Sequence, residues 1–273
     1  MSLITFIGCG NMGKGMLTAL CNNTTVKRDD ILVFEPDDAK RKAVEEEFGV
    51  KGITDNKQGI KDSKYILLAV KPQVLPAVMK DIAPTLKECA AAGDEKVLVS
   101  IAAGTPIEKI ESLEEGAGIP VVRIFPNLPA AIGEGLLFFC ANDDKSKSYV
   151  GELKDMFKEA GITTEYPEAS LEIAGFMGGC LPAYAYIFIE ALSDGAVACG
   201  MQRKDAITFA AQAVKGAAGL VLQGDKHPGQ LKDEVCSPGG TTIAGVRSLE
   251  ECAFRDAAIS AVVNAYERSQ ELK

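Results

Sequence analysis

A glycine-rich turn between a short apolar strand and a helix constrains this chain more than any other feature. Leu3–Ile7 is an apolar run with a β-branched bias, which predicts a strand. The sequence GCGNMG follows, and a helical pattern continues through Leu20. In this order the first glycine permits a tight turn, the second lets a pyrophosphate approach the backbone, and the third lets helix and strand pack closely. The turn predicts a dinucleotide-binding fold with cofactor contacts from Ile7, Gly8, Cys9, Gly10, Asn11, Met12 and Gly13.

The predicted second strand, Ile31–Glu35, ends in an acidic residue. Glu35 follows the last glycine of the turn by about 20 residues, the spacing of the acid that binds the ribose in NAD sites. A carboxylate there accepts hydrogen bonds from the ribose hydroxyls and repels a 2′-phosphate, which favours NADH. A strand-end acid that faces solvent is the alternative. Lys40 and Arg41 follow closely, so NADPH stays open as the cofactor.

Two continuous apolar runs, Tyr65–Val70 and Val97–Ile101, are typical of buried parallel strands. Ligands of such sheets bind outside the carboxyl ends of the strands, so we expect the segments that follow these runs to face the cofactor. Lys71 could equally be a solvated lysine. Strands and helices alternate up to position 166, which indicates one doubly wound α/β domain over residues 1–166. The other expected elements are helices at 38–48 and 148–160 and strands at 53–54, 121–125, 136–140 and 162–166.

The pattern changes after Pro167. No convincing strand follows, and alanine-rich helical patterns cover Leu181–Cys199, Lys204–Leu222 and Glu250–Leu272. We therefore expect a second, all-helical domain over residues 167–273. A helical domain this apolar often completes its core against a partner subunit, so we expect a homodimer formed through the C-terminal helices.

Within Leu231–Glu250, a proline and two glycines precede two threonines and a helical pattern. A turn that opens directly into a helix leaves backbone N–H groups free, and the helix dipole adds partial positive charge there. Gly239 and Gly240 allow close approach to the backbone, and Thr241 and Thr242 offer hydroxyls. The turn suits a small anion such as a carboxylate, although a capped helix without a ligand fits the same pattern.

The run VCSPGGTTIAGVRSLE, which begins at Val235, resembles the characteristic motif of the pyrroline-5-carboxylate reductases. The similarity extends through His227-Pro-Gly-Gln-Leu-Lys-Asp, Pro182-Ala-Tyr-Ala-Tyr and the N-terminal glycines, and so covers nearly the whole chain. It implies NAD(P)H-dependent reduction of Δ1-pyrroline-5-carboxylate to L-proline, the last step of proline biosynthesis. It also implies dimers that assemble into larger rings.

The resemblance assigns site residues as well. Thr242 would donate its hydroxyl near the ring nitrogen of the substrate, and Glu234 would reach the cofactor across the dimer. Glu168 would contact ligand, although an acid at a helix start is an equal alternative. The implied substrate contacts are Glu168, Val235, Ser237, Gly239, Gly240, Thr241 and Thr242. The implied cofactor contacts, besides the glycine turn and Glu35, are Asn56, Ala69, Val70, Lys71, Pro72, Ala102, Ala103 and Glu234.

Two departures from the family pattern leave other functions open. Leu128 replaces a threonine, and Gly178-Gly179-Cys180-Leu181 stands where relatives carry Ser-Gly-Ser-Gly. Reduction of a different cyclic imino acid is therefore an alternative, and a non-enzymatic dinucleotide sensor is a weaker one. Hydroxyacid dehydrogenases with this two-domain plan need a lysine early in the helical domain, and residues 173–199 contain none.

Composition excludes further classes. The 273 residues carry a net charge of −9, and the pI near 4.9 argues against nucleic acid as a partner. Eight cysteines without a CxxC pair, together with one histidine, argue against a metal site and are typical of free thiols in a reducing compartment. The N-terminus shows no basic region before an apolar stretch, and the longest apolar runs fall short of a membrane span. We expect a cytoplasmic protein that binds no membrane.

Overall fold

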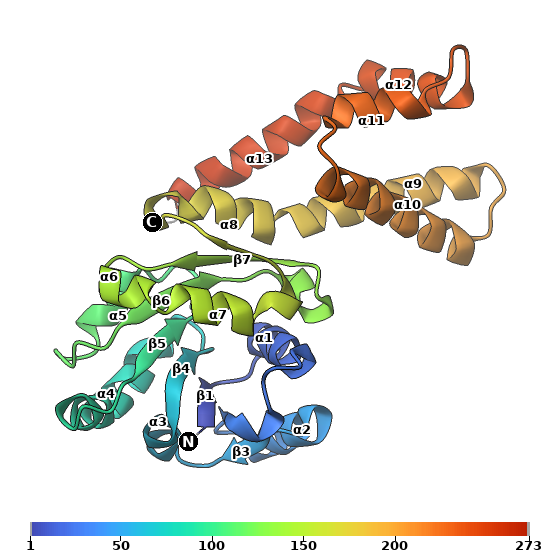
Figure 1. Ribbon diagram of the computed structural model, residues 1–273. Coiled ribbons are helices and arrows are strands. Elements are labelled where there is room, and N and C mark those ends of the chain that lie inside the picture. The colour runs from blue at the N-terminus through green and yellow to red at the C-terminus, as the bar shows by residue number, and fades with distance from the viewer. Residues whose placement is uncertain (1, 272–273) are drawn as a thin grey trace. The chain divides into compact units, whose positions relative to one another are not determined.

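A computed structural model describes residues 2–271 (Figure 1). The chain divides into two compact units, Met1–Gly179 and Cys180–Lys273. The first unit is built on a sheet and the second contains helices. The last strand ends at Glu165, close to the expected domain boundary at 166/167, and the next helices still belong to the first unit.

One sheet of eight strands forms the centre of the first unit, in the order β3-β2-β1-β4-β5-β6-β7-β8. All neighbouring strands pair in parallel except β6 and β7, which pair antiparallel. The expected α/β class is therefore confirmed, with one reversed strand pair. The strands are β1 Ser2–Ile7, β2 Ile31–Phe34, β3 Lys51–Ile53, β4 Ser63–Leu68, β5 Val97–Ser100, β6 Val121–Phe125, β7 Gly135–Cys140 and β8 Gly161–Glu165.

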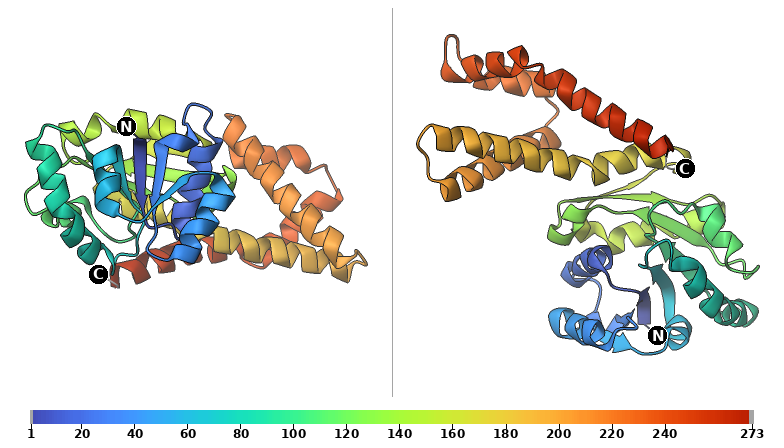
Figure 2. Two further views of the ribbon diagram at one scale, coloured as in Figure 1. Left: turned by 90° about the horizontal axis from the view of Figure 1, so that it is seen from below. Right: turned by 180° about the vertical axis from the view of Figure 1, so that it is seen from behind.

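Helices cover both faces of this sheet, as Figures 1 and 2 show. Alternate residues of each strand point to opposite faces, so the strands feed two separate apolar clusters. One cluster joins Phe6 and Leu67 to α1, α2 and α7, and the other joins Ile66 and Leu98 to α3, α4, α5 and α8. The helices of this unit are α1 Asn11–Asn22, α2 Asp38–Phe48, α3 Asn56–Asp62, α4 Leu75–Ala91, α5 Ile107–Ser112, α6 Asp144–Lys147, α7 Val150–Met156 and α8 Leu171–Gly179, with short 3₁₀ helices η1 Arg28–Asp30, η2 Leu128–Ile132, η3 Lys158–Ala160 and η4 Glu168–Ser170.

The strand order changes direction between β1 and β4. The chain runs from β1 outward through β2 to β3, and then returns to add β4 on the other side of β1. The loops that leave the carboxyl ends of β1 and β4 therefore diverge above and below the sheet. Such a switch point is where open α/β sheets bind their ligands.

The second unit consists of helices that bury little of their own surface. They are α9 Leu181–Ala198, α10 Arg203–Gln223, α11 Pro228–Val235, α12 Thr241–Glu251 and α13 Phe254–Glu271. Helices α9 and α10 pack as an antiparallel pair (Figure 1), while the Tyr184 hydroxyl donates to the Ala261 carbonyl oxygen at 3.2 Å and links α9 to α13. Within the described part of this unit, only Ser193 and Ala206 are buried.

Large apolar side chains of this unit are exposed in the single chain. Ile187 is 67% exposed, Leu222 69% and Ile259 63%, and they come from three different helices. Large apolar side chains exposed in this number are typical of helices that pack against a partner.

Several element boundaries differ from the sequence-based expectation. The helix expected at 148–160 is shorter, because α7 ends at Met156 and a 3₁₀ turn takes up Lys158–Ala160. The helix expected to begin at Glu250 begins at Phe254, because Glu250 still belongs to α12 and Ala253 adopts a positive φ of 53° between the two helices. The expected last residue of that helix, Leu272, lies outside the described residues.

The expectation that every apolar run falls short of a membrane span is wrong by length and composition. Ile173–Ala198 and Arg203–Gln223 are both long and apolar enough to cross a membrane. Small residues and few charges give them this character, which suits close packing between helices equally well.

We predict that the thermal stability of this protein depends on its concentration. If a second copy covers the exposed helices, dilution shifts the equilibrium toward unfolded monomer. A hundredfold dilution should lower the Tm by about 2–4 °C. Differential scanning calorimetry over that range measures it, with light scattering to follow the molar mass. A Tm that stays constant while the molar mass is that of a monomer would contradict the prediction.

Candidate functional site

The turn after β1 is held tightly against the end of β4. The Gly8 N–H donates to the Phe34 carbonyl oxygen at 2.8 Å, and the Ala69 N–H donates to the Ile7 carbonyl oxygen at 2.9 Å. Gly8 has a φ of +86°, and a Cβ there would lie 2.8 Å from Val70 Cγ1 and 2.9 Å from the Ala69 carbonyl oxygen. Only glycine fits this position, both for its backbone angle and for its contacts.

Helix α1 begins directly at this turn with its amide groups available. Its N-cap is Gly10, which has no side chain to cap the first N–H groups, and a Cβ there would meet nothing within 4 Å. By contrast, a Cβ on Gly13 would lie 3.2 Å from Ala69 Cβ, so this glycine serves helix–strand packing. Free N–H groups, the helix dipole and open space above Gly10 form a cradle that fits a pyrophosphate.

Cys9 contributes its backbone to this turn. Its side chain is 6% exposed, and burial raises the pKa of the thiol to about 12. The thiol therefore stays neutral at physiological pH. It places no negative charge beside the anion cradle and is not a nucleophile.

Glu35 lies beside the glycine turn, as its position after β2 predicts. Its Oε2 accepts a hydrogen bond from the Cys9 N–H at 3.3 Å. The Arg41 guanidinium donates to the Glu35 carbonyl oxygen at 3.2 Å and pairs with Asp38 at 2.6 Å. Lys40 is more exposed and lies 3.7 Å from Asp37. The carboxylate thus lies next to the dinucleotide turn, with one arginine in the first turn of α2 close by.

The loops after β4 and β5 lie at the same edge of the sheet. Ala69 and Val70 pack against the glycine turn, whereas the side chain of Lys71 is exposed and Pro72 is partly buried. After β5, the Ala102 N–H donates to Ser100 Oγ at 3.3 Å, and the neighbouring Ala103 is exposed. Small side chains at this edge leave room for a ring system.

Asn56 begins helix α3 and is 8% exposed. Its Nδ2 donates to Asp81 Oδ2 at 3.0 Å, and Lys57 pairs with the other oxygen of Asp81 at 3.0 Å. These two hydrogen bonds lower the pKa of the Asp81 carboxyl. Sequence reasoning missed Asp81, since nothing in its position within α4 indicates that it would hold the side chain of Asn56.

Glu168 is occupied by protein donors on both of its oxygens. Oε1 accepts from the Ile107 N–H at 2.9 Å and from Arg123 at 3.0 Å, and Oε2 accepts from Asn142 Nδ2 at 3.0 Å. The side chains of Glu168 and Arg123 are 18% and 10% exposed. This arrangement ties η4 to the start of α5 and to β6, which favours the structural interpretation of this acid.

The glycine turn of the second unit has the form that its sequence predicts. The Gly240 N–H donates to the Ser237 carbonyl oxygen at 3.0 Å, and Gly239 has a φ of +68°. Helix α12 begins at Thr241, with Gly240 as an N-cap that provides no side-chain cap. The hydroxyls of Thr241 and Thr242 therefore stand in the first helical turn, beside uncapped N–H groups. A Cβ on Gly240 would lie 2.3 Å from Ser237 Oγ.

Two further residues near this turn have local partners. His227 caps α11, because its Nδ1 accepts from the Gly229 N–H at 3.1 Å while its own N–H donates to Gln230 Oε1 at 3.1 Å. Glu234 accepts from Lys226 Nζ at 2.6 Å on the surface of the unit. Val235 is 66% exposed. The single histidine thus has a structural role here.

The segment that departs from the family pattern begins in the sheet unit. The Asn127 side chain donates to the Gly178 carbonyl oxygen at 3.0 Å and accepts from the Leu136 N–H at 2.8 Å. The adjacent Leu128 is 56% exposed, and Cys180 is a free, partly buried cysteine. The amide of Asn127 holds the backbone at the end of α8. The residues that differ from the family pattern therefore change side chains and not the position of Gly178.

Family comparisons agree with both units. The family model described as pyrroline-5-carboxylate reductase dimerisation matches residues 168–272, which include α8 and every helix of the second unit. A model described as NADP oxidoreductase, coenzyme F420-dependent, matches residues 3–104, where the glycine turn and β4 lie.

Relatives match over the full chain. A pyrroline-5-carboxylate reductase of Synechocystis sp. is 38% identical over 97% of this chain and 96% of its own length. That of Methanosarcina acetivorans is 36% identical over 98% of this chain and 97% of its own length.

Solved structures agree in fold. The pyrroline-5-carboxylate reductase of Coxiella burnetii superposes with a TM-score of 0.89 at 30% identity, covering 100% of this chain and 98% of that one. The pyrroline carboxylate reductase of Plasmodium falciparum, solved with NADP bound, gives 0.81 at 31% identity, covering 99% of this chain and 97% of that one. This chain, with its Rossmann-type sheet followed by a helical dimerisation domain, belongs to the pyrroline-5-carboxylate reductase family.

Proposed function

We propose that this protein reduces Δ1-pyrroline-5-carboxylate to L-proline with NADPH or NADH. The observation that carries this proposal is the pair of glycine turns, one in each unit, that both open into uncapped helices. The first suits the pyrophosphate of a dinucleotide and the second suits the carboxylate of the substrate. Full-length similarity to pyrroline-5-carboxylate reductases supports the same reaction.

The sheet unit would hold the cofactor. The amides at the start of α1 would bind its pyrophosphate, Glu35 would accept hydrogen bonds from its ribose, and the small residues after β4 and β5 would admit its nicotinamide. When bound, the nicotinamide supplies a hydride from its C4 to the imine carbon. NADP in the related Plasmodium falciparum structure and the NADP oxidoreductase model both support a phosphorylated cofactor, for which Arg41, bound to the Glu35 carbonyl oxygen, is a candidate cation.

The helical unit would hold the substrate. In this proposal the N–H groups after Gly239 bind the carboxylate, and the Thr242 hydroxyl lies near the ring nitrogen, which gains a proton as the imine becomes an amine. Such a reaction asks mainly for positioning, since the cofactor carries the hydride. Val235, Ser237 and Thr241 would complete the turn.

We further propose residues 167–273 as the unit of substrate binding and dimerisation, in a cytoplasmic enzyme whose dimers can form a larger ring. Exposed apolar helices and the dimerisation family model support the dimer. Glu234, which pairs with Lys226 in the single chain, would exchange that partner for the cofactor of the other subunit.

The direct test is oxidation of NADPH and NADH by the purified protein with pyrroline-5-carboxylate, with proline identified by mass spectrometry. Turnover that requires the imine would support the proposal.

Thr242→Ala should lower kcat/KM by about 10- to 100-fold, because a single transition-state hydrogen bond of about 1.5–3 kcal/mol is lost. Thr24→Ala, in an exposed loop, is the matched control. Binding of both cofactors without turnover would reject the proposed reaction, and full activity of Thr242→Ala would remove this hydroxyl from the site.

Cofactor choice should depend on Glu35. Replacing it with serine removes the negative charge beside the ribose, so the ratio of kcat/KM for NADPH to that for NADH should rise by about tenfold. Glu46→Ser, on the exposed face of α2, controls for the change in net charge. An unaltered ratio in the Glu35 variant would show that this carboxylate does not face the ribose.

Glu168→Gln should reduce stability without weakening substrate binding. The amide keeps one acceptor but loses the charge that pairs with Arg123, so the free energy of unfolding should fall by about 2 kcal/mol. Urea denaturation measures this loss, and steady-state kinetics measure KM for the imine. A KM raised by about tenfold with unchanged stability would instead assign Glu168 to the substrate site.

A further inference from the structure

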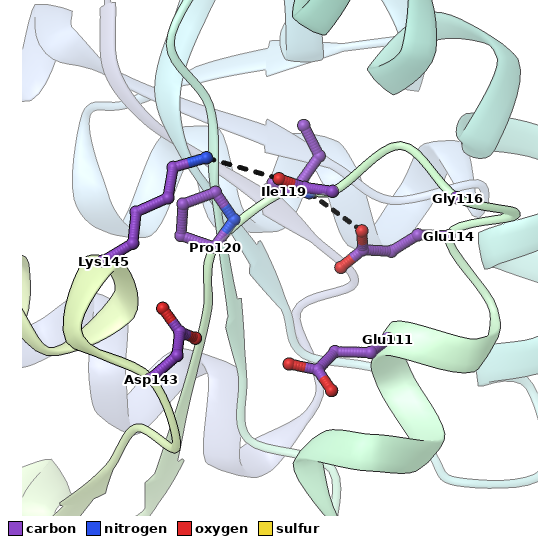
Figure 3. Close-up of a pocket in the computed structure, with 8 residues that line it drawn as sticks. Glu111, Glu114, Gly116, Ile119, Pro120, Asp143 and Lys145 are labelled. Atoms are coloured by element: carbon purple, nitrogen blue, oxygen red, sulfur yellow. Dashed lines mark hydrogen bonds between the residues drawn. The ribbon is translucent and has the colours of Figure 1, made fainter.

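A pocket lies at the end of the sheet opposite the dinucleotide turn. It is formed where the chain enters β6, between the end of α5 and the start of α6, and it has a volume of about 310 Å³. Figure 3 shows Glu111 and Glu114 on one side and Asp143 and Lys145 on the other. The volume is at the lower end of the range for small-molecule sites.

Glu114 is the unusual member of this lining. Its side chain is 2% exposed, and Oε2 accepts from the Ile119 N–H at 2.9 Å. Its other oxygen, Oε1, is the one buried side-chain polar atom without a hydrogen-bond partner in the part of the chain that the structure describes. In Figure 3 this oxygen points into the space between Glu111, Asp143 and Lys145. An acceptor left in this state calls for a donor, because an unsatisfied buried polar group costs about 1–3 kcal/mol.

The surrounding charges do not supply that donor. Both oxygens of Asp143 are engaged by Ser146, at 2.9 Å from its N–H and 2.6 Å from its hydroxyl. The Lys145 ammonium donates to the Gly118 carbonyl oxygen at 3.3 Å. Glu111 is exposed at the rim and adds a second negative charge. The pocket is therefore an acidic space with one lysine on its wall.

Burial raises the pKa of Glu114 to about 7, and the nearby Glu111 charge acts in the same direction. The Ile119 N–H, which donates to Oε2, the nearby Gly118 N–H and the Lys145 charge act against it. The carboxyl is thus ionised above neutral pH and neutral below it. A bound cation would favour the ionised form, which couples occupancy of the pocket to pH.

We propose that this pocket binds a small organic cation through its N–H donors, as a primary ammonium or a guanidinium group. Glu114 Oε1 would accept the buried hydrogen bond, and Glu111 would supply the second carboxylate at the rim. Two carboxylates on one wall favour a cation whose own N–H groups can donate hydrogen bonds to both. Among residues 2–271, no three acidic, histidine or cysteine side chains are grouped so as to hold a metal ion.

Isothermal titration calorimetry of the full-length protein with propylguanidinium and propylammonium tests this proposal. At least one of them should bind at pH 8, while tetramethylammonium, which has the charge but no N–H donor, should not. Binding should be about tenfold weaker at pH 6, because a carboxyl with a pKa of about 7 is mostly protonated there. Absence of binding by both N–H cations at pH 8, or equal binding of tetramethylammonium, would overturn the proposal.

Glu114→Gln is the central variant. It keeps an acceptor for the Ile119 N–H and removes the charge, so binding should be lost. The adjacent Glu115→Gln is the matched control, since Glu115 is exposed and pairs with Lys87 at 3.3 Å outside the pocket. Lys145→Met should tighten binding by removing the like charge from the wall. Wild-type affinity in Glu114→Gln, or a weaker affinity in Lys145→Met, would contradict the assignment.

The same variant has a thermal signature that does not need a ligand. The folded wild type keeps its proton up to about pH 7, whereas the pKa of an unfolded glutamate is about 4.5. Relative to Glu114→Gln, the unfolding free energy of the wild type should therefore fall as the pH rises from 4.5 to 7. Thermal unfolding across this range confirms that the variant is folded. Parallel pH profiles for the two proteins would show that the pKa of Glu114 is not raised in the folded state, which would contradict the proposal.

Discussion

The close contact between the β1–α1 turn and the end of β4 is the constraint on which the sheet unit depends. Gly8 lies so close to Ala69 and Val70 that there is no room for a side chain. The first helix therefore starts at the edge of the sheet, and no side chain caps its first N–H groups. Because the strand order reverses at this point, the loops after β1 and β4 lead to helices on opposite faces of the sheet, a position where open α/β sheets bind their ligands. The residues that this packing requires are thus also the ones that we propose to bind the cofactor.

The helical unit differs from the sheet unit, because its packing is incomplete within one chain. Its helices carry small residues that allow close approach and large apolar residues that remain exposed, such as Phe209 at 59% and Leu220 at 62%. Burial of such surface is the main favourable term in folding. Packing against a second copy would bury these side chains and stabilise this unit, which agrees with its match to a dimerisation family.

Three glutamates show how environment assigns a role to the same side chain. Glu35 accepts a bond from the glycine turn and remains available to a ribose. Glu168 is saturated by Ile107, Arg123 and Asn142, so it acts as a tie between elements. Glu114 is buried with one oxygen unsatisfied and a pKa shifted toward neutrality. Only the first of these roles follows from the position of the residue in the sequence.

The sequence by itself determined the α/β class, the change to helices after the last strand, and both glycine turns. Those features rest on local patterns: apolar periodicity, glycine spacing and a proline before a helix. Tertiary structure alone decided the partners of Glu168, the hold of Asp81 on Asn56 and the buried carboxyl of Glu114. The first two depend on contacts between residues far apart in the chain, Arg123 with Glu168 and Asn56 with Asp81, and local patterns carry no record of which distant donors meet. The burial of Glu114 depends on how its loop packs in the folded sheet unit.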